Sequence, residues 1–267
     1  MIGIFDSGLG GLSVLAAIAK ALPAADMRYL ADTAYVPYGN KDEAFIRARV
    51  LKIGRYLADQ GCSLIVVACN TATAAAVTML RSALPNIPVV GIEPGIKPAA
   101  HSTRSGRIAV LATESTARSM RLSSLIQRYA GNVCVDVIAC PGWANRVESL
   151  QLDDPGFTKS AHHRLAQTLE AGADRIVLGC THYTFLAPAL TPLVAGRAQL
   201  VDVAEAVARQ CRRLAGTTEN SQGRLILQAT AHPERLQAAL PALGLAQLLP
   251  RLQEAAAQID IRAERWQ

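Results

Sequence analysis

The sequence has 267 residues, of which 51% are hydrophobic and 18% are charged, so the chain can bury one large core or two modest ones and is not a disordered, charge-driven chain. The formal net charge of +6 comes mostly from scattered single arginines, and aromatic residues make up only 4%. A nucleic-acid-binding surface usually shows a basic stripe with stacking aromatics, so we expect no nucleic-acid partner.

The sequence gives no sign of membrane insertion or secretion. No stretch approaches 18 uninterrupted apolar residues, and the first residues, MIGIFDSG, contain neither a basic n-region nor a cleavage site. We therefore expect a cytoplasmic protein without a membrane partner, whose six cysteines are free thiols.

Short runs rich in Val, Ile and Leu recur along the chain and are bounded by Gly, Pro or polar residues. Such runs are typical of strands that are covered on both faces, as in parallel sheets. We expect strands at 2–5, 27–31, 63–68, 87–92, 107–112, 133–139, 175–179 and 198–203. Helical patterns lie at 10–21, 42–59, 71–83, 115–129, 159–171 and 203–214. The stretch 233–264 reads as helical and strand-free, with breaks near Pro241 and Pro250. The alternation predicts an α/β fold with parallel sheets.

The sequence also contains a weak internal repeat. IGIFDSG at 2–8 resembles RIAVLATEST at 107–116, and IVVACNTAT at 65–73 resembles IVLGCTHYT at 176–184. Chance similarity between buried strands accounts for the apolar runs, but not for the shared Cys followed by hydrogen-bonding residues. We therefore expect two similar α/β halves.

Two of the cysteines, Cys69 and Cys180, follow predicted strands in matching contexts. Ligands of α/β sheets bind beyond the carboxyl ends of the strands, and each cysteine precedes a predicted helix start, where free N–H groups lower a thiol pKa. One thiol could remove a proton from a carbon and the other return one to the opposite face, which inverts that carbon. His182 could orient or protonate Cys180. We assign the other cysteines to packing: Cys62, Cys134, Cys140 and Cys211.

Other polar residues follow the first two strands. Asp6 and Ser7 precede GLGG at 8–11, whose spacing does not match G-x-G-x-x-G, so we interpret it as a plain helix-entry turn. The loop at 31–40 forms a polar turn that contains Asp32, Tyr38 and Asn40. We expect the remaining histidines on the surface: His101, His162, His163 and His232.

The motifs DSG, CNTAT and GCTHY follow one another in this order within the first 190 residues. They lie in the blocks IGIFDSGLGGLSVL, YLADTAYVPYGNK, IVVACNTATA, GIEPGIKPA, VLATESTARS and LGCTHYTFL. Together they closely resemble the glutamate racemases of the cofactor-independent aspartate/glutamate racemase superfamily. The resemblance implies two pseudo-twofold-related α/β domains with the active site in the cleft between them. We place the first domain at 1–92 plus 206–267 and the second at 93–205.

The resemblance also implies roles for individual residues. Cys69 and Cys180 would be the acid/base residues, with Asp6 supporting Cys69 and His182 assisting Cys180. Glu148, in ANRVESL, resembles the family's acidic residue near the second thiol. The substrate-binding residues would be Asp6, Ser7, Pro37, Tyr38, Gly39, Asn70, Thr71, Thr113, Thr116, Thr181 and His182.

The activity that the resemblance implies is the interconversion of L- and D-glutamate for peptidoglycan synthesis. It implies a homodimer in many members, and neither pyridoxal phosphate nor a metal. Three alternatives stay open: a racemase for aspartate or another small acid, a Cys-dependent hydrolase or transferase, and a non-catalytic amino-acid-binding module. The hydrolase would need one nucleophilic cysteine and would leave the second one unexplained.

Overall fold

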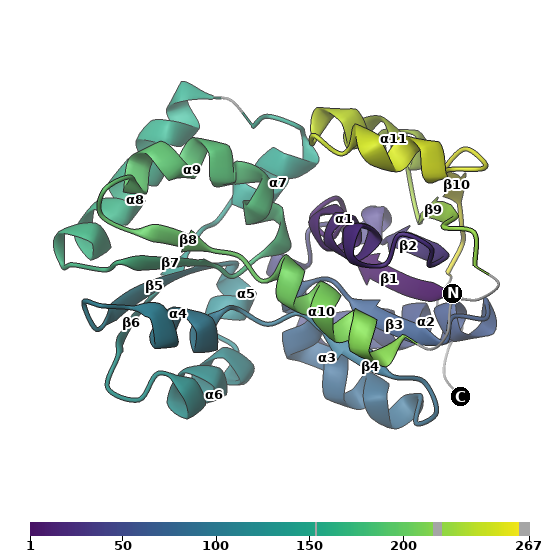
Figure 1. Ribbon diagram of the computed structural model, residues 1–267, viewed down its shortest axis with the longest axis horizontal. Coiled ribbons are helices and arrows are strands. Elements are labelled where there is room, and N and C mark those ends of the chain that lie inside the picture. Colours follow the sequence, from purple (N-terminus) through teal and green to yellow (C-terminus); the bar gives the residue numbers. More distant parts are fainter. Residues whose placement is uncertain (153, 216–220, 262–267) are drawn as a thin grey trace.

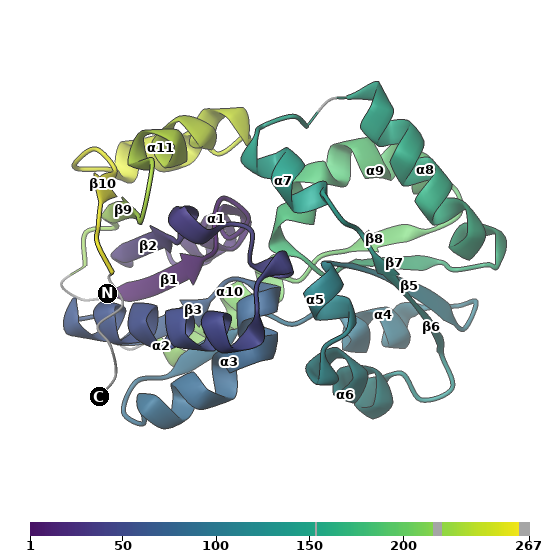
Figure 2. The same ribbon diagram turned by 180° about the vertical axis from the view of Figure 1, so that it is seen from behind.

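The apolar runs of the sequence form two sheets of parallel strands in a computed structural model, which describes residues 1–152, 154–215 and 221–261 (Figures 1 and 2). The first sheet contains β1 (Ile2–Asp6), β2 (Met27–Ala31), β3 (Leu64–Val67), β4 (Val89–Gly91), β9 (Leu225–Ala229) and β10 (Ala257–Gln258). The second contains β5 (Arg107–Ala112), β6 (Cys134–Ala139), β7 (Arg175–Leu178) and β8 (Gln199–Val201). Neighbouring strands of the described residues run parallel. The predicted α/β fold class is confirmed.

The two sheets repeat one strand order. The first has the order β10-β9-β2-β1-β3-β4 and the second β6-β5-β7-β8, so β5 to β8 reproduce the arrangement of β1 to β4. The similar segments of the sequence lie on β1 and β5 and begin on β3 and β7. The internal repeat therefore corresponds to two halves of the same topology, which lie side by side in Figure 1. We call β1–β4 with β9 and β10 the first half, and β5–β8 the second half.

The exact domain boundaries stay a prediction. The predicted boundary at 205/206 falls inside the helix α10 (Ala204–Leu214), which packs against α1 (Leu12–Ala21) of the first half. Two parts of the predicted first domain, 216–220 and 262–267, lie outside the described residues.

Helices connect the strands and cover the sheets. The α-helices are α1 (Leu12–Ala21), α2 (Glu43–Asp59), α3 (Asn70–Ala83), α4 (Ile96–Ser102), α5 (Glu114–Ala117), α6 (Met120–Tyr129), α7 (Trp143–Glu148), α8 (Pro155–Glu170), α9 (Ala187–Val194), α10 (Ala204–Leu214) and α11 (Pro233–Ala242). The 3-10 helices are η1 (Thr33–Tyr35), η2 (Tyr38–Asn40), η3 (Thr181–Leu186) and η4 (Ala246–Arg251). None of the described helices combines the length and apolarity that crossing a bilayer requires.

The structure corrects three expectations about these elements. The helix predicted at 115–129 is two helices, because the Ser119 side chain accepts a hydrogen bond from the Leu122 N–H and begins α6 anew. The stretch 233–264 is not strand-free, since β10 pairs with β9, a strand that was not predicted. No apolar run marks the two residues of β10, so only tertiary pairing defines it. Residues 262–264 of that stretch lie outside the described part of the chain.

The third correction concerns a cysteine. Cys134 is exposed, because it begins β6, the outer strand of the second sheet. The packing role predicted for the other three cysteines is confirmed by their burial, as is the surface position of the four histidines: Cys62, Cys140 and Cys211; His101, His162, His163 and His232.

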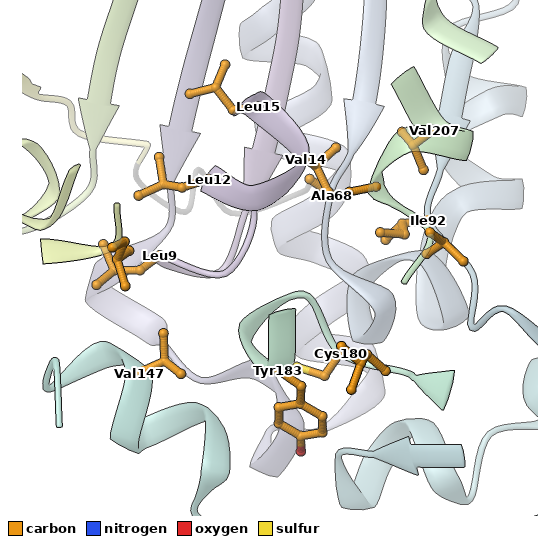
Figure 3. Packing of buried hydrophobic residues seen from close by; sticks show 14 of the residues in the cluster. Leu9, Leu12, Val14, Leu15, Ala68, Ile92, Val147, Cys180, Tyr183 and Val207 are labelled. Carbon is orange, nitrogen blue, oxygen red and sulfur yellow. The ribbon is translucent and has the colours of Figure 1, made fainter. Parts of the chain in front are cut away.

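The core continues across the contact between the halves. One cluster of buried apolar residues includes Ile4 and Val66 of the first sheet together with Leu111 and Ile176 of the second. Figure 3 shows this cluster, with residues of both halves in one packed region. Continuous apolar burial favours the approach of the two halves, since each removes apolar surface of the other from water.

The start of α2 gives a local stability test. The Asp42 carboxylate accepts hydrogen bonds from the N–H groups of Ala44 and Phe45, so Asp42→Ala should lower the free energy of unfolding by about 1 kcal/mol in urea titrations. The control is Asp59→Ala at the end of the same helix, where a carboxylate has no N–H group to satisfy. Equal losses in the two variants would contradict the capping role.

Candidate active site

Cys69 lies at the carboxyl ends of the strands of the first sheet, between the end of β3 and the first turn of α3. Its Sγ accepts a hydrogen bond from the Ala72 N–H at 3.5 Å and lies 4.0 Å from Ser7 Oγ, just beyond β1. Asp6 ends β1 and is fully buried, with Oδ2 accepting from the Gly11 N–H at 2.8 Å. Because β1 and β3 are parallel neighbours, their carboxyl ends bring Asp6, Ser7 and Cys69 together.

The environment of Cys69 holds its thiol protonated. Burial, followed by the negative charge of Asp6, raises the pKa of Cys69 well above its usual value, and the Ala72 N–H opposes this only in part. The expected lowering of the pKa by the helix N-terminus is therefore wrong for Cys69, because desolvation outweighs one N–H group. The charge of Cys180 contributes to the same rise, so the two thiols are within electrostatic reach of each other.

Cys180 follows β7 in the position of the second half that corresponds to Cys69. Its Sγ lies 3.6 Å from His182 Nδ1, and His182 Nε2 lies 2.6 Å from Glu148 Oε1 at the end of α7. The same Glu148 oxygen accepts a hydrogen bond from the Leu9 N–H at 2.7 Å. A thiol, an imidazole and a carboxylate of the second half are therefore joined directly to the backbone of the first.

The contacts of His182 favour its protonated form. Burial by itself would lower the pKa of His182, but its hydrogen bonds to Cys180 and Glu148 outweigh burial and raise the pKa well above the usual value. Burial also raises the pKa of Asp6, against the opposing charge of His182. The two thiols thus have different neighbours: Cys69 lies beside a carboxyl group and Cys180 beside an imidazolium.

The glycines of GLGG allow the two halves to approach closely. A Cβ on Gly8 would lie 2.1 Å from Glu148 Oε1, and a Cβ on Gly10 would lie 2.4 Å from His182 Nδ1. The interpretation of GLGG as a plain helix-entry turn is therefore incomplete. The turn does lead into α1, but Gly8 and Gly10 are also the points where side chains of the second half contact the first. Thr181 belongs to the same contact, with Oγ1 at 2.7 Å from the Cβ position of Gly10.

Three threonine hydroxyls form a second bridge between the halves. Thr71 Oγ1, in the first turn of α3, lies 3.1 Å from Thr113 Oγ1 and 3.2 Å from Thr116 Oγ1, which are 3.0 Å from each other. Next to Thr71, the buried side chain of Asn70 has no hydrogen-bond partner for Oδ1 or Nδ2 among the described residues. Unpartnered buried polar groups are costly, so this amide is suited to hold a polar ligand.

The predicted loop at Pro37, Tyr38 and Gly39 forms a wall beside these hydroxyls. Tyr38 is buried and its hydroxyl donates to Asp32, so this hydroxyl is engaged within the protein rather than free for a substrate. A Cβ on Gly39 would lie 3.0 Å from Thr113 Cβ. A cavity of about 740 Å³ opens next to this contact and is lined by Gly39 and Thr71 among others.

Sequence reasoning did not single out Arg49, which forms an ion pair with Asp32. A signal was present, because Arg49 lies on the buried face of α2 with Ile46, Val50 and Ile53. An arginine within an apolar helical stripe must find a buried partner. In the described residues, no group of three or more His, Cys, Asp or Glu side chains is arranged to hold a metal ion.

The charge on His182 leads to a prediction about stability. A pKa raised in the folded state stabilises the fold fully below the unfolded-state pKa, near 6.5, and this contribution is lost as the pH rises through the raised pKa. The unfolding free energy of the wild type should therefore exceed that of His182→Gln by more at about pH 6 than at about pH 9 in urea titrations. The exposed control His163→Gln should show no such trend. A difference between wild type and His182→Gln that does not depend on pH would refute the imidazolium.

The chain is similar to known racemases in both sequence and structure. Residues 2–211 match the family model described as Asp/Glu/Hydantoin racemase. A glutamate racemase of Pseudomonas aeruginosa is 46% identical over 80% of both chains, and one of Pseudomonas paraeruginosa is 41% identical over 97% of both.

Solved structures gave the same result. Escherichia coli glutamate racemase, in complex with L-glutamate and the activator UDP-MurNAc-Ala, has a TM-score of 0.82 and 30% identity over 97% of both chains. Thermus thermophilus glutamate racemase, in complex with beta-chloro-D-alanine, has a TM-score of 0.77 and 35% identity over 97% of this chain and 96% of that one.

Proposed function

Because the chain belongs to the Asp/Glu/Hydantoin racemase family, we propose that it is a glutamate racemase that interconverts L- and D-glutamate by proton transfer between the α-carbon and two thiols, Cys69 and Cys180. The observation that carries this proposal is the pair of buried strand-end thiols, 5% and 6% exposed, at equivalent positions of two repeated halves. Two groups on opposite sides of one carbon are what inversion without a cofactor requires.

The neighbours of the thiols suggest their starting roles. The His182 ring lies 3.6 Å from Cys180 Sγ, where a proton can pass between them, whereas burial and then the charge of Asp6 raise the pKa of Cys69 and keep it as a thiol. In this form Cys180 takes the α-proton on one face, and Cys69 gives its own proton to the other face. Cys180 then holds the proton and Cys69 is the thiolate, which is the form that reacts with the opposite enantiomer.

The carbanion-like transition state must be stabilised by fixed polar groups. The amide of Asn70 and the hydroxyls of Thr71, Thr113 and Thr116 are suited to hold the carboxylates of glutamate. Asp6 also has one buried oxygen, Oδ1, without a partner in the described part of the chain, and would face the amino group together with Ser7. Burial of these groups keeps water away and strengthens each interaction.

Substrate entry requires the two halves to separate locally. Thr71 lines the cavity of about 740 Å³ and also contacts the hydroxyls of Thr113 and Thr116 in the other half. We infer that glutamate enters at this point and that these hydroxyl contacts are exchanged for contacts with substrate as the halves close. We further infer that the protein acts as a cytoplasmic homodimer that supplies D-glutamate for peptidoglycan, as the family resemblance implies.

The first test removes each thiol. Cys69→Ala and Cys180→Ala should each lower racemisation by ~10²–10⁴-fold, because each loses one positioned acid or base. The measurement is the circular dichroism of L-glutamate and of D-glutamate over time. The control is Cys134→Ala, at an exposed position on β6, which should racemise like the wild type. Normal turnover by either thiol variant would disprove the two-thiol mechanism.

The second test separates racemisation from the alternatives. In D₂O the wild type should incorporate deuterium at the α-carbon during inversion, because the proton returned comes from a solvent-exchanged thiol. Mass spectrometry of the amino acid measures the incorporated deuterium, and mass spectrometry of the protein detects any covalent intermediate. A covalent acyl-enzyme on one cysteine would favour a hydrolase or transferase, and binding of glutamate without exchange would favour a binding module. Faster inversion of aspartate than of glutamate would reassign the substrate.

A further inference from the structure

A buried carboxylate holds the loop that forms one wall of the proposed site. Asp32 follows β2 and is fully buried. Its Oδ1 accepts from Arg49 Nη2 at 2.7 Å and from Thr230 Oγ1 at 2.9 Å. Its Oδ2 accepts from Arg49 Nε at 2.9 Å and from the Tyr38 hydroxyl. The Asp32 carboxylate therefore accepts hydrogen bonds from residues of α2 and η2 and from the residue that follows β9.

Arg49 connects this carboxylate to the last described residues of the chain. Besides its two bonds to Asp32, its Nη1 donates to the Ile261 carbonyl at 2.7 Å. The guanidinium also lies 4.5 Å from the ring centroid of Tyr35, the last residue of η1. Three directed contacts of this kind require the planar fork of arginine, and the single ammonium group of lysine cannot make them together.

The loop that this network holds carries residues of the site. Tyr38 is anchored to Asp32, and the next residue, Gly39, lies against Thr113 and lines the cavity beside Thr71. A displacement of Tyr38 would therefore move the surface against which the hydroxyl cluster rests. Errors of about 1 Å in such positions can lower the rate by ~10²-fold.

We propose that Asp32 and Arg49 are positioning residues for racemisation, which hold the Tyr38–Gly39 wall against Thr113 and anchor it to the Ile261 carbonyl. Neither residue touches the thiols, so they act through the loop. This inference rests on the proposed function, because the effect is expected on glutamate turnover.

The molecule provides a matched control at the other end of the same two strands. Asp26, before β2, accepts from Arg224 Nε at 3.2 Å and from Arg224 Nη2 at 2.8 Å, and Arg224 precedes β9. This pair has the same chemistry as Asp32 with Arg49, but it lies at the amino ends of the strands, away from the thiols. Because the Arg224 side chain is 42% exposed and that of Arg49 is 5% exposed, the melting temperatures of the two variants are needed to separate loss of folded protein from loss of positioning.

The experiment compares Arg49→Lys with Arg224→Lys in the full-length protein. Arg49→Lys should lower kcat/KM for glutamate by about tenfold to a hundredfold, through both a higher KM and a lower kcat. Arg224→Lys should keep kcat/KM within about twofold of wild type. The melting temperature is measured for both, so that loss of folded protein is accounted for.

Tyr38→Phe is a second variant, which keeps the ion pair and removes only the hydroxyl that ties the loop to Asp32. It should lower kcat/KM in the same direction as Arg49→Lys while its melting temperature stays closer to wild type. Full activity of both Arg49→Lys and Tyr38→Phe, or equal activity losses in Arg49→Lys and Arg224→Lys, would overturn the positioning role. A wild-type protein that does not racemise glutamate would instead refute the proposed function, before any variant is compared.

Discussion

The contact at Glu148 is the interaction on which the arrangement of the site depends. One carboxylate oxygen accepts from the Leu9 N–H of the first half and contacts His182 of the second. The approach is possible only because Gly8 and Gly10 leave room for these side chains. The same carboxylate thus joins the halves and, together with Cys180, raises the pKa of His182. Structure and electrostatics of the site are therefore set together at this point.

Duplication of one α/β unit explains why the two thiols occupy equivalent positions in the two halves. In each half the cysteine follows the strand next to the central β1 or β5, where the carboxyl ends of parallel strands gather. Cys180 and Ala68, the residue before Cys69, both belong to the apolar cluster that crosses the contact between the halves (Figure 3). Neither half alone contains both groups, so the proposed chemistry belongs to the contact between them.

The symmetry of the backbone does not extend to the charges. Cys69 has Asp6 and Ser7 as neighbours, whereas Cys180 has His182. A reaction that converts mirror images needs two opposed groups, but one of them must start with a proton and the other without it. The surroundings of the thiols differ accordingly in a nearly symmetric fold, since burial and the charge of Asp6 raise the pKa of Cys69, whereas Cys180 lies beside an imidazole.

The sequence by itself determined the α/β class, the internal repeat and the equivalent strand-end positions of Cys69 and Cys180, because apolar runs and the residues that follow them are local patterns. It also brought out Asp6, His182 and Glu148 through their family motifs. Only the tertiary structure decided the raised pKa of Cys69, the Asp32–Arg49 network and the pairing of β10. These depend on burial and on contacts between residues far apart in the chain. The apolar stripe around Arg49 signals that this arginine is buried, but no local pattern identifies the carboxylate that it meets or the extent of desolvation at Cys69.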